Sequence, residues 1–318
     1  MNILVTGASG FVGFSLCKSL IKDNHHVTAI VRSKNHDLNV SSVFFKLIDA
    51  KTDFRDSLNF IDLVIHLAGR VHVMQDKNSN SLDEYRGINV DSTLNLARQA
   101  ASLGVKRFVF LSSAKVNGEI NNAGQPFTAD DKPDPKDPYG ISKFEAEFAL
   151  MQLSKETGME VVIIRPPLVY GPGVKANFLS MMNWLYKSIP IPFGMIDNKR
   201  SLVFIDNLVD LLIRVIDHPK AAGQVFLVSD DHDVSTTTLL KSMSSALGKK
   251  VKLISVPLFF LKIIFCLIGK SNLSQRLLGS LCLDISKTKE ILDWTPPVSF
   301  EEGIKKTAKS FLNKKGRI

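Results

Sequence analysis

Short apolar runs alternate with longer segments of helical periodicity through the first half of the chain. Such runs are typical of parallel strands that are buried on both faces. We expect strands at residues 3–5, 27–31, 43–47, 63–67, 108–112 and 161–164, with helices at 14–22, 91–101 and 138–157. This alternation predicts an α/β fold built on a doubly wound parallel sheet.

The alternation loosens after Pro166. Glycine and proline at 171–173 and 189–192 indicate loops, and the apolar run at 202–205 predicts a strand that returns to the main sheet. We therefore expect one domain over 1–169, to which 201–228 returns. A smaller, discontinuous lobe is expected over 170–200 and 229–318.

Residues 254–268 form an almost continuously apolar run, interrupted by Ser255 and Lys262. The run is too short, and too charged at its centre, to span a bilayer. We expect a buried helix of the smaller lobe that begins after Pro257. The alternative is a helix that lies at a membrane surface and gives weak membrane association.

Composition is that of a globular protein: 318 residues, 45% of them hydrophobic, suffice for a full core and two lobes. Cys17, Cys266 and Cys282 lack the spacing of metal ligands, and their odd number argues against a disulfide framework. The first expected strand begins at Ile3, which leaves no room for a signal peptide, so we expect a cytoplasmic location.

The formal net charge of +9 raises the question of nucleic acid binding. The basic residues are spread along the chain without a recognition motif, so we expect no nucleic acid partner. Lysines near the C-terminus are most simply a solvated helix end. A small anionic substrate accounts equally well for the positive bias.

A glycine-rich segment, Thr-Gly-Ala-Ser-Gly-Phe-Val-Gly at 6–13, joins the first strand to the first helix. Such a loop directs backbone N–H groups and the positive end of a helix dipole at a pyrophosphate. Its glycines recur every third residue, which departs from the G-x-G-x-x-G spacing. Alone, it could also be an ordinary tight turn.

Tyr139 and Lys143 lie four residues apart and therefore share one face of the helix expected at 138–157. A cation close to a phenol lowers the phenol pKa toward the working range of a general acid/base. Tyrosine and lysine at this spacing also occur by chance on solvated helices. Their position downstream of the glycine loop favours a catalytic pair.

Further motifs complete the pattern: His-Leu-Ala-Gly at 66–69, Asn89, Leu-Ser-Ser-Ala at 111–114, and Arg-Pro-Pro-Leu-Val-Tyr-Gly-Pro at 165–172. With 6–13 and 139–143, they make the chain resemble the extended short-chain dehydrogenase/reductase family over most of its length. This family contains nucleotide-sugar epimerases, dehydratases and reductases. The resemblance implies a Rossmann-type fold and a catalytic triad of Ser113, Tyr139 and Lys143, with Ser112 as the alternative serine.

The resemblance also implies an NAD(P) cofactor and the residues that contact it: Gly7, Ser9, Gly10, Phe11, Val12, Gly13, Arg32, Asp49, Ala50, Leu67, Ala68, Gly69, Tyr139, Lys143 and Pro166. Asp49 and Ala50 would lie on the adenine side. The acidic residue that usually ends the second strand is replaced by Val31, which is followed by Arg32. An arginine there accommodates a 2′-phosphate, so we expect NADP(H) to be favoured over NAD(H). An exposed basic turn is the alternative.

On the substrate side, the resemblance implies four contacts: Lys115, Asn177, Arg200 and Arg276. Arg200 matches an arginine that reaches the substrate diphosphate, for which a guanidinium fork is well suited; Arg276 is a weaker candidate for the same role. Lys115 lies near the expected sugar C4 site or is a solvent-facing loop charge. The family usually has Tyr at the position of Asn117 and often Asn at the position of Leu168, so a polar contact is missing there.

The segment Ser-Ser-Ala-Lys-Val-Asn-Gly at 112–118 resembles a bacterial surface-polysaccharide branch of the family. We expect hydride transfer at C4 of a UDP-hexose, as NAD(P)H-dependent reduction of a UDP-4-keto-6-deoxy-N-acetylhexosamine. The alternative is a UDP-glucose or UDP-N-acetylglucosamine 4-epimerase with tightly bound NAD. A non-catalytic dinucleotide sensor is more remote, because Tyr139 and Lys143 are both present. A homodimer is expected.

Overall fold

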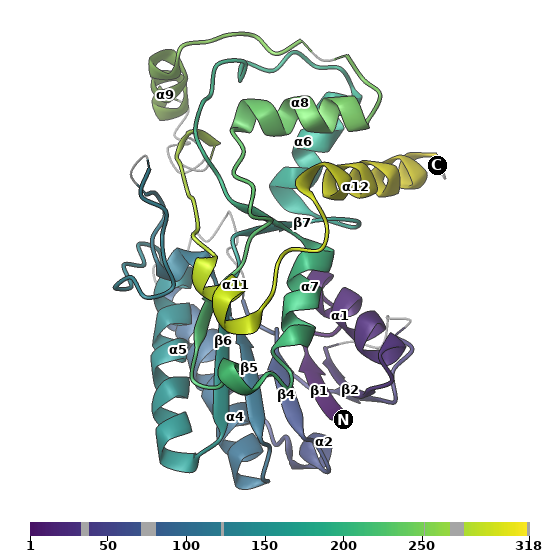
Figure 1. Cartoon of the computed structure of the whole chain (residues 1–318), viewed down its shortest axis with the longest axis vertical. Coiled ribbons are helices and arrows are strands. Elements are labelled where there is room, and N and C mark those ends of the chain that lie inside the picture. Colours follow the sequence, from purple (N-terminus) through teal and green to yellow (C-terminus); the bar gives the residue numbers. More distant parts are fainter. Residues whose placement is uncertain (33–37, 71–80, 122–123, 251, 268–276, 317–318) are drawn as a thin grey trace.

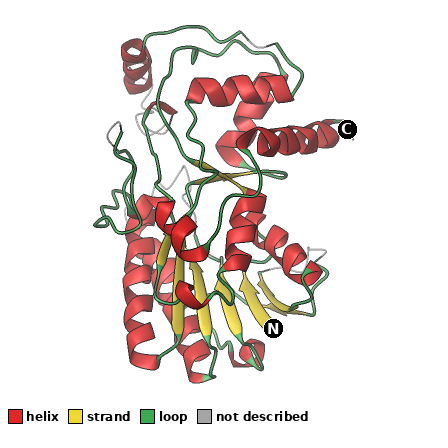
Figure 2. Cartoon of the chain, in the orientation of Figure 1, coloured by secondary structure: helices red, strands yellow, loops and turns green. Residues whose placement is uncertain are grey.

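The computed structural model describes residues 1–32, 38–70, 81–121, 124–250, 252–267 and 277–316. A large lobe surrounds a parallel sheet, and a smaller helical lobe lies beyond the carboxyl ends of its strands (Figure 1). Figure 2 shows the strands of the large lobe side by side with helices packed around them.

The main sheet has seven strands in the order β3-β2-β1-β4-β5-β6-β9, and all neighbouring strands are parallel. Their bounds are β1 (Asn2–Thr6), β2 (His26–Val31), β3 (Ser42–Phe45), β4 (Leu63–His66), β5 (Arg107–Leu111), β6 (Glu160–Arg165) and β9 (Val225–Leu227). This is the expected doubly wound, Rossmann-type sheet. Strand β3 is shifted from the expected 43–47, because its residues are largely exposed at the sheet edge and only weakly constrained by apolar pattern.

Helices cover both faces of the sheet, and each face has its own apolar core. Helices α1 (Phe11–Lys22) and α7 (Ile205–Arg214) pack together on one face. Helices α4 (Ser92–Ser102) and α5 (Pro138–Thr157) cover the other, with the short α2 (Arg55–Leu58) beside α4. Strands buried on both sides explain the near-continuous apolar runs of the sequence.

The smaller lobe contains α6 (Ala176–Tyr186), α8 (Thr236–Ala246), α9 (Leu258–Leu267) and α12 (Phe300–Lys315), while α11 (Ser286–Leu292) packs beside β9. Strands β7 (Leu168–Tyr170) and β8 (Leu202–Phe204) form a separate two-stranded parallel sheet. The expectation that 202–205 returns to the main sheet is therefore wrong. The added strand is β9, and an apolar run of four residues, as at 202–205, does not by itself specify which strand it pairs with.

Helix α9 corrects a second expectation, that of a buried helix. Leu261 is 2% exposed, but Phe259, Phe260 and Leu267 are 68%, 56% and 81% exposed. In Figure 1 the helix lies at the far end of the smaller lobe from the main sheet. Within the described ranges, no helix is long and apolar enough to cross a membrane.

Candidate active site

The glycine-rich turn between β1 and α1 has the shape of an anion cradle. Gly7 has a φ of +68°, and a Cβ there would lie 2.9 Å from the Ala68 backbone nitrogen. A Cβ on Gly13 would lie 2.2 Å from the Gly7 carbonyl oxygen, so the helix can approach the turn only with glycine at this position. Helix α1 begins at Phe11 without a side-chain cap or a first-turn acidic residue. Its positive end therefore fits a pyrophosphate.

Two of the predicted catalytic side chains, Ser113 and Tyr139, meet where β5 ends and α5 begins. Asp137 caps α5 by accepting a hydrogen bond of 2.7 Å from the Gly140 backbone nitrogen. The Ser113 hydroxyl hydrogen-bonds to the Tyr139 phenol and accepts from the Lys115 backbone nitrogen at 3.2 Å. The Ser112 hydroxyl is buried with no partner among the described residues. The structure thus brings Ser113 to Tyr139.

The protonation of Tyr139 and Lys143 is set mainly by burial. Desolvation raises the pKa of Tyr139 to about 12, although the Ser113 hydrogen bond opposes the shift. The Lys143 ammonium donates to the Leu111 carbonyl at 2.9 Å, and burial lowers its pKa to about 8 against the attraction of Glu147. The expected lowering of the Tyr139 pKa is therefore wrong for the protein groups alone. Near neutral pH they hold Tyr139 as a phenol and Lys143 as a cation.

A buried histidine lies beneath this pair, at the end of β4. The His66 Nδ1 atom is 2.8 Å from the Thr6 hydroxyl, and Nε2 is 3.0 Å from the Thr93 hydroxyl. Thr93 donates its proton to the Asn89 carbonyl at 2.8 Å, so Nε2 must carry the hydrogen that joins His66 to Thr93. Nδ1 then accepts from Thr6, which itself accepts from the Ala68 backbone nitrogen at 3.2 Å.

This network requires a neutral imidazole. Burial and the nearby Lys143 charge lower the pKa of His66 to about 3. The ring stacks on Phe110 at a centroid distance of 5.9 Å, and the Lys143 ammonium lies 4.4 Å from the centroid of the same Phe110 ring. His66 therefore packs against the ring that Lys143 contacts, without adding a second positive charge.

Asn89 connects the loop after β4 to the catalytic helix. It lies in a π-helical turn, η1 (Gly87–Asp91), between α3 (Ser81–Arg86) and α4. Its amide accepts from the Arg70 backbone nitrogen at 2.8 Å and donates to Ser142 on α5 at 2.9 Å. A Cβ on Gly69 would lie 3.0 Å from Asn89 Oδ1 and 3.3 Å from Lys143 Nζ. The predicted contact Gly69 is thus held directly beside Lys143.

Sequence reasoning placed His66 and Asn89 in motifs but missed their place in the site. A usable signal was present. Thr6 and His66 are polar residues that end apolar strands, and β1 and β4 pair them directly. Polar residues at the carboxyl ends of adjacent parallel strands share one edge of the sheet, where ligands bind in such folds.

Lys115 has an internal role that neither sequence interpretation anticipated. Its ammonium forms ion pairs with Asp137 and, at 3.3 Å, with Glu119. Asp137 is the residue that caps α5, so Lys115 ties the loop after β5 to the start of the catalytic helix. A substrate contact by Lys115 remains a prediction.

Asn117, which stands where the family usually has Tyr, is buried and fully engaged. It accepts from Arg165 at 3.1 Å and donates to the Thr128 carbonyl at 2.8 Å. Arg165 also forms a buried two-pronged pair with Glu147 on α5. Asn117 therefore helps to hold Arg165, which in turn fixes α5 against β6.

The residues expected around the adenosine lie at the appropriate strand ends. Arg32 is exposed directly after β2, next to the buried Val31. The Asp49 carboxylate accepts from the Lys51 nitrogen at 2.8 Å and from the Thr52 hydroxyl at 2.9 Å, which lowers its pKa. Asp49 thereby closes a local turn. The contacts of Arg32 and Asp49 with cofactor stay predictions.

The predicted substrate contacts are less organised. Arg200 donates to the Gly279 carbonyl at 2.9 Å and exchanges backbone hydrogen bonds with Val234. Asn177 is half-buried in the first turn of α6. Arg276 lies outside the described residues. Contacts of these residues with substrate stay predictions.

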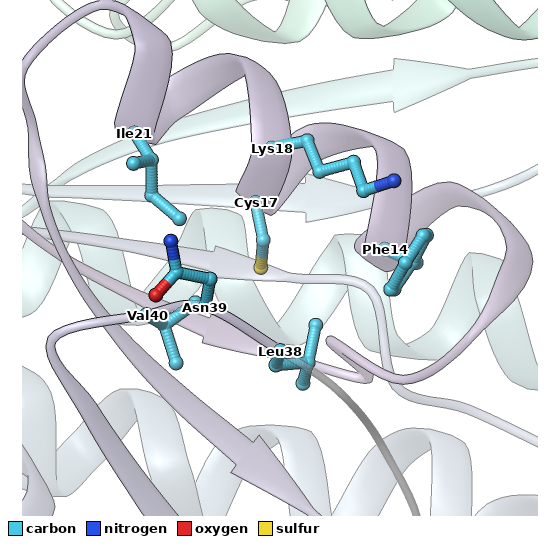
Figure 3. Close-up of a pocket in the computed structure, with 7 residues that line it drawn as sticks. All are labelled: Phe14, Cys17, Lys18, Ile21, Leu38, Asn39 and Val40. Carbon is cyan, nitrogen blue, oxygen red and sulfur yellow. The ribbon is translucent and has the colours of Figure 1, made fainter.

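A hollow of about 220 Å³ lies between α1 and residues 38–40 (Figure 3). It is smaller than the roughly 300 Å³ at which ligand pockets begin. Burial raises the pKa of Cys17, which lines it, to about 12, so this thiol stays protonated. The hollow contains none of the predicted catalytic side chains. In the described part of the chain, no cluster of His, Cys, Asp or Glu could hold a metal ion.

Comparison with known proteins gives a consistent result. The model of the NAD dependent epimerase/dehydratase family matches residues 3–229. A UDP-glucose 4-epimerase of Vibrio cholerae is 51% identical over 99% of this chain and 97% of its own length. The crystal structure of a UDP-glucuronic acid 4-epimerase from Bacillus cereus in complex with NAD has a TM-score of 0.80 at 22% identity, covering 98% of this chain and 99% of that one. A Thermotoga maritima UDP-glucose 4-epimerase with UDP-glucose has a TM-score of 0.79 at 23% identity, covering 99% of both chains.

Proposed function

The chain belongs to the NAD dependent epimerase/dehydratase family, and from this membership we propose that it is a UDP-hexose 4-epimerase. The observation that carries the proposal is the 51% identity, over nearly the whole of both chains, with the Vibrio cholerae UDP-glucose 4-epimerase. This relative favours the epimerase alternative over the reductase that the sequence led us to expect. The site is compatible with this activity, because Ser113 follows β5 and hydrogen-bonds to Tyr139 on α5, and Lys143 on α5 donates to the end of β5.

The chain's own residues fit a nicotinamide dinucleotide. The turn at Gly7–Gly13 and the uncapped start of α1 would hold its pyrophosphate, and Gly69 beside Lys143 would lie near its nicotinamide end. We propose NAD as the resident cofactor. When bound, it would supply the hydride acceptor for C4 and, in its oxidised form, a positive charge.

Tyr139 moves the proton in this proposal. In its ionised form, which the positive charge of the bound dinucleotide would favour, the Tyr139 phenolate takes the proton of the C4 hydroxyl as that carbon is oxidised. It returns the proton when the carbon is reduced on its other face. Ser113 hydrogen-bonds to Tyr139 and would hold the same C4 oxygen. Lys143, a cation below about pH 8, stabilises the ionised phenol from the same face of α5.

The test is a pair of assays on one preparation. We expect the purified protein to interconvert UDP-glucose and UDP-galactose without added dinucleotide, with no net change in nicotinamide absorbance; the UDP-N-acetylhexosamines are assayed in parallel. Stoichiometric oxidation of NADPH by a UDP-4-keto-6-deoxy-N-acetylhexosamine, with no interconversion of any UDP-hexose, would establish the reductase instead.

A further inference from the structure

The far end of the smaller lobe carries a group of exposed apolar side chains, here called the α9 surface: Ile189, Met195, Ile254, Leu258, Phe259, Phe260, Ile263 and Leu267. These residues come from two segments, 189–195 and 254–267. Backbone hydrogen bonds join the segments, from the Ile254 nitrogen to the Ile191 carbonyl at 2.9 Å and from the Gly194 nitrogen to the Ile254 carbonyl at 3.0 Å. Groups of large exposed apolar side chains often mark a binding face.

The α9 surface is held in place by a few buried contacts. Leu261 is 2% exposed and belongs to the core. Its neighbours Phe259 and Phe260 remain mostly exposed, and their rings pack edge to face with centroids 5.9 Å apart. The helix is therefore anchored to the lobe through one side and presents large apolar groups on another. Nothing among the described residues covers these two phenylalanines.

The charged residues in the sequence around α9 are all of one sign. Between Asp233 and Asp284 the sequence contains no Asp or Glu, but it contains seven basic residues: Lys241, Lys249, Lys250, Lys252, Lys262, Lys270 and Arg276. The whole chain has 31 acidic residues in 318, about one in ten, so a segment of this length would ordinarily carry several. Lys250 and Lys252 are exposed just before α9. The segment thus combines an apolar helix with charged residues that are all basic.

We propose that the α9 surface docks on an anionic lipid membrane. Apolar side chains on a helix too short to cross a bilayer enter the boundary between headgroups and acyl chains, and flanking lysines bind the anionic headgroups. A second copy of the chain fits less well. A two-fold interface would place this surface against itself and bring the same lysines together without an acidic partner. The proposal does not depend on which reaction the enzyme catalyses.

Flotation of the full-length protein with lipid vesicles tests the proposal. We expect the protein to float with vesicles containing roughly one-third phosphatidylglycerol at low salt, and to be released by about 0.5 M salt. It should stay behind with vesicles of phosphatidylcholine alone. The double variant Phe259→Ser/Phe260→Ser should lower the bound fraction at least about tenfold.

Phe60→Ser is the matched control, because Phe60 is 92% exposed on the large lobe and its loss should leave flotation unchanged. Lys250→Glu/Lys252→Glu provides a second variant pair, which should weaken binding to anionic vesicles without removing apolar area. Each variant is first checked for wild-type thermal unfolding. No flotation of the wild type at low salt, or equal flotation of the wild type and both double variants, would overturn the proposal. So would a dimer that Phe259→Ser/Phe260→Ser converts to monomer in the absence of vesicle binding.

Discussion

Two regions of this molecule reverse the usual placement of side chains. At the carboxyl ends of β4 and β5, His66, Asn89 and Lys143 are almost completely buried. On α9, at the far end of the other lobe, Phe259 and Phe260 are more than half exposed. Buried polar groups and exposed apolar patches are the two observations that carry most information about function.

The two regions differ in whether partners inside the protein offset their unfavourable placement. Burying a polar group is costly unless it is hydrogen-bonded, and each of the three buried residues has a partner within the chain. The exposed phenylalanines have no such compensation inside the protein. The first region is therefore explained by chemistry within the fold, and the second by something outside it.

The largest expected effect is on the buried region. Tyr139→Phe keeps the ring and removes the proton-transferring oxygen, so kcat should fall roughly 10²–10⁴-fold while dinucleotide binding is retained. Steady-state kinetics and fluorescence titration of the cofactor measure the two quantities. Tyr186→Phe, a change of the same size on α6, should be nearly silent. Turnover of Tyr139→Phe within a few-fold of wild type would remove Tyr139 from the mechanism.

The second prediction concerns the acid stability of the fold. The pKa of His66 is about 3 in the folded protein and near 6.5 when unfolded. Below pH 6.5 the unfolded state therefore binds a proton that the folded state does not. Its contribution to stability is fully present above 6.5 and is lost as the pH falls toward 3, at up to about 1.4 kcal/mol per pH unit.

Replacing the titrating ring should flatten this slope. Urea unfolding of wild type and His66→Gln between pH 7 and 4.5 measures it, and the slope is the readout even if His66→Gln is less stable at every pH. His26→Gln, at an exposed position at the start of β2, is the control and should keep the wild-type slope. Parallel slopes for wild type and His66→Gln would show that His66 does not titrate as its buried network requires.

A smaller effect is expected on dinucleotide binding by Arg32, which is exposed after β2. NAD, the proposed resident cofactor, has no 2′-phosphate, so Arg32 would matter only for added NADPH. Arg32→Ala should weaken binding of NADPH about tenfold or more and that of NADH much less, because only NADPH loses a charge-assisted contact. Isothermal titration with both dinucleotides gives the ratio. Equal weakening of both would make Arg32 an ordinary residue of an exposed turn.

The smallest effect should come from the exposed region. Phe260→Ser should change the free energy of unfolding by less than about 0.5 kcal/mol, because the side chain contributes little to the core. Leu261→Ala, one residue further along α9, should cost roughly 2 kcal/mol or more. Thermal unfolding compares them. A large loss for Phe260→Ser would mean that this ring is covered within the protein, and the contrast between the two regions would disappear.

The large lobe was predictable from sequence because its strands are buried on both faces and therefore read as short apolar runs. The short strands β8 and β9 were not, since three apolar residues carry no register information. The exposure of α9 was also not predictable from residues 254–268, because an apolar run does not indicate which other elements pack against it. Exposure of Phe259 depends on the path of the whole smaller lobe.

Motifs identified Ser113, Tyr139 and Lys143 as candidates, but they did not predict the pKa shifts of Tyr139 and Lys143. Helical spacing predicted that Lys143 would lower the Tyr139 pKa, yet burial raises it. The hydrogen bonds of His66 depend on strand register, which joins residues 60 apart in sequence. Such long-range pairings follow from the fold and not from local pattern.

The central claim is that hydride leaves C4 and returns to the same carbon. UDP-glucose with deuterium at C4 tests it most directly, with mass spectrometry of the UDP-galactose formed in the presence of unlabelled NAD. The account predicts that the product retains nearly all of its deuterium. Loss of the label to solvent, or its transfer to the free dinucleotide pool at every turnover, would contradict it.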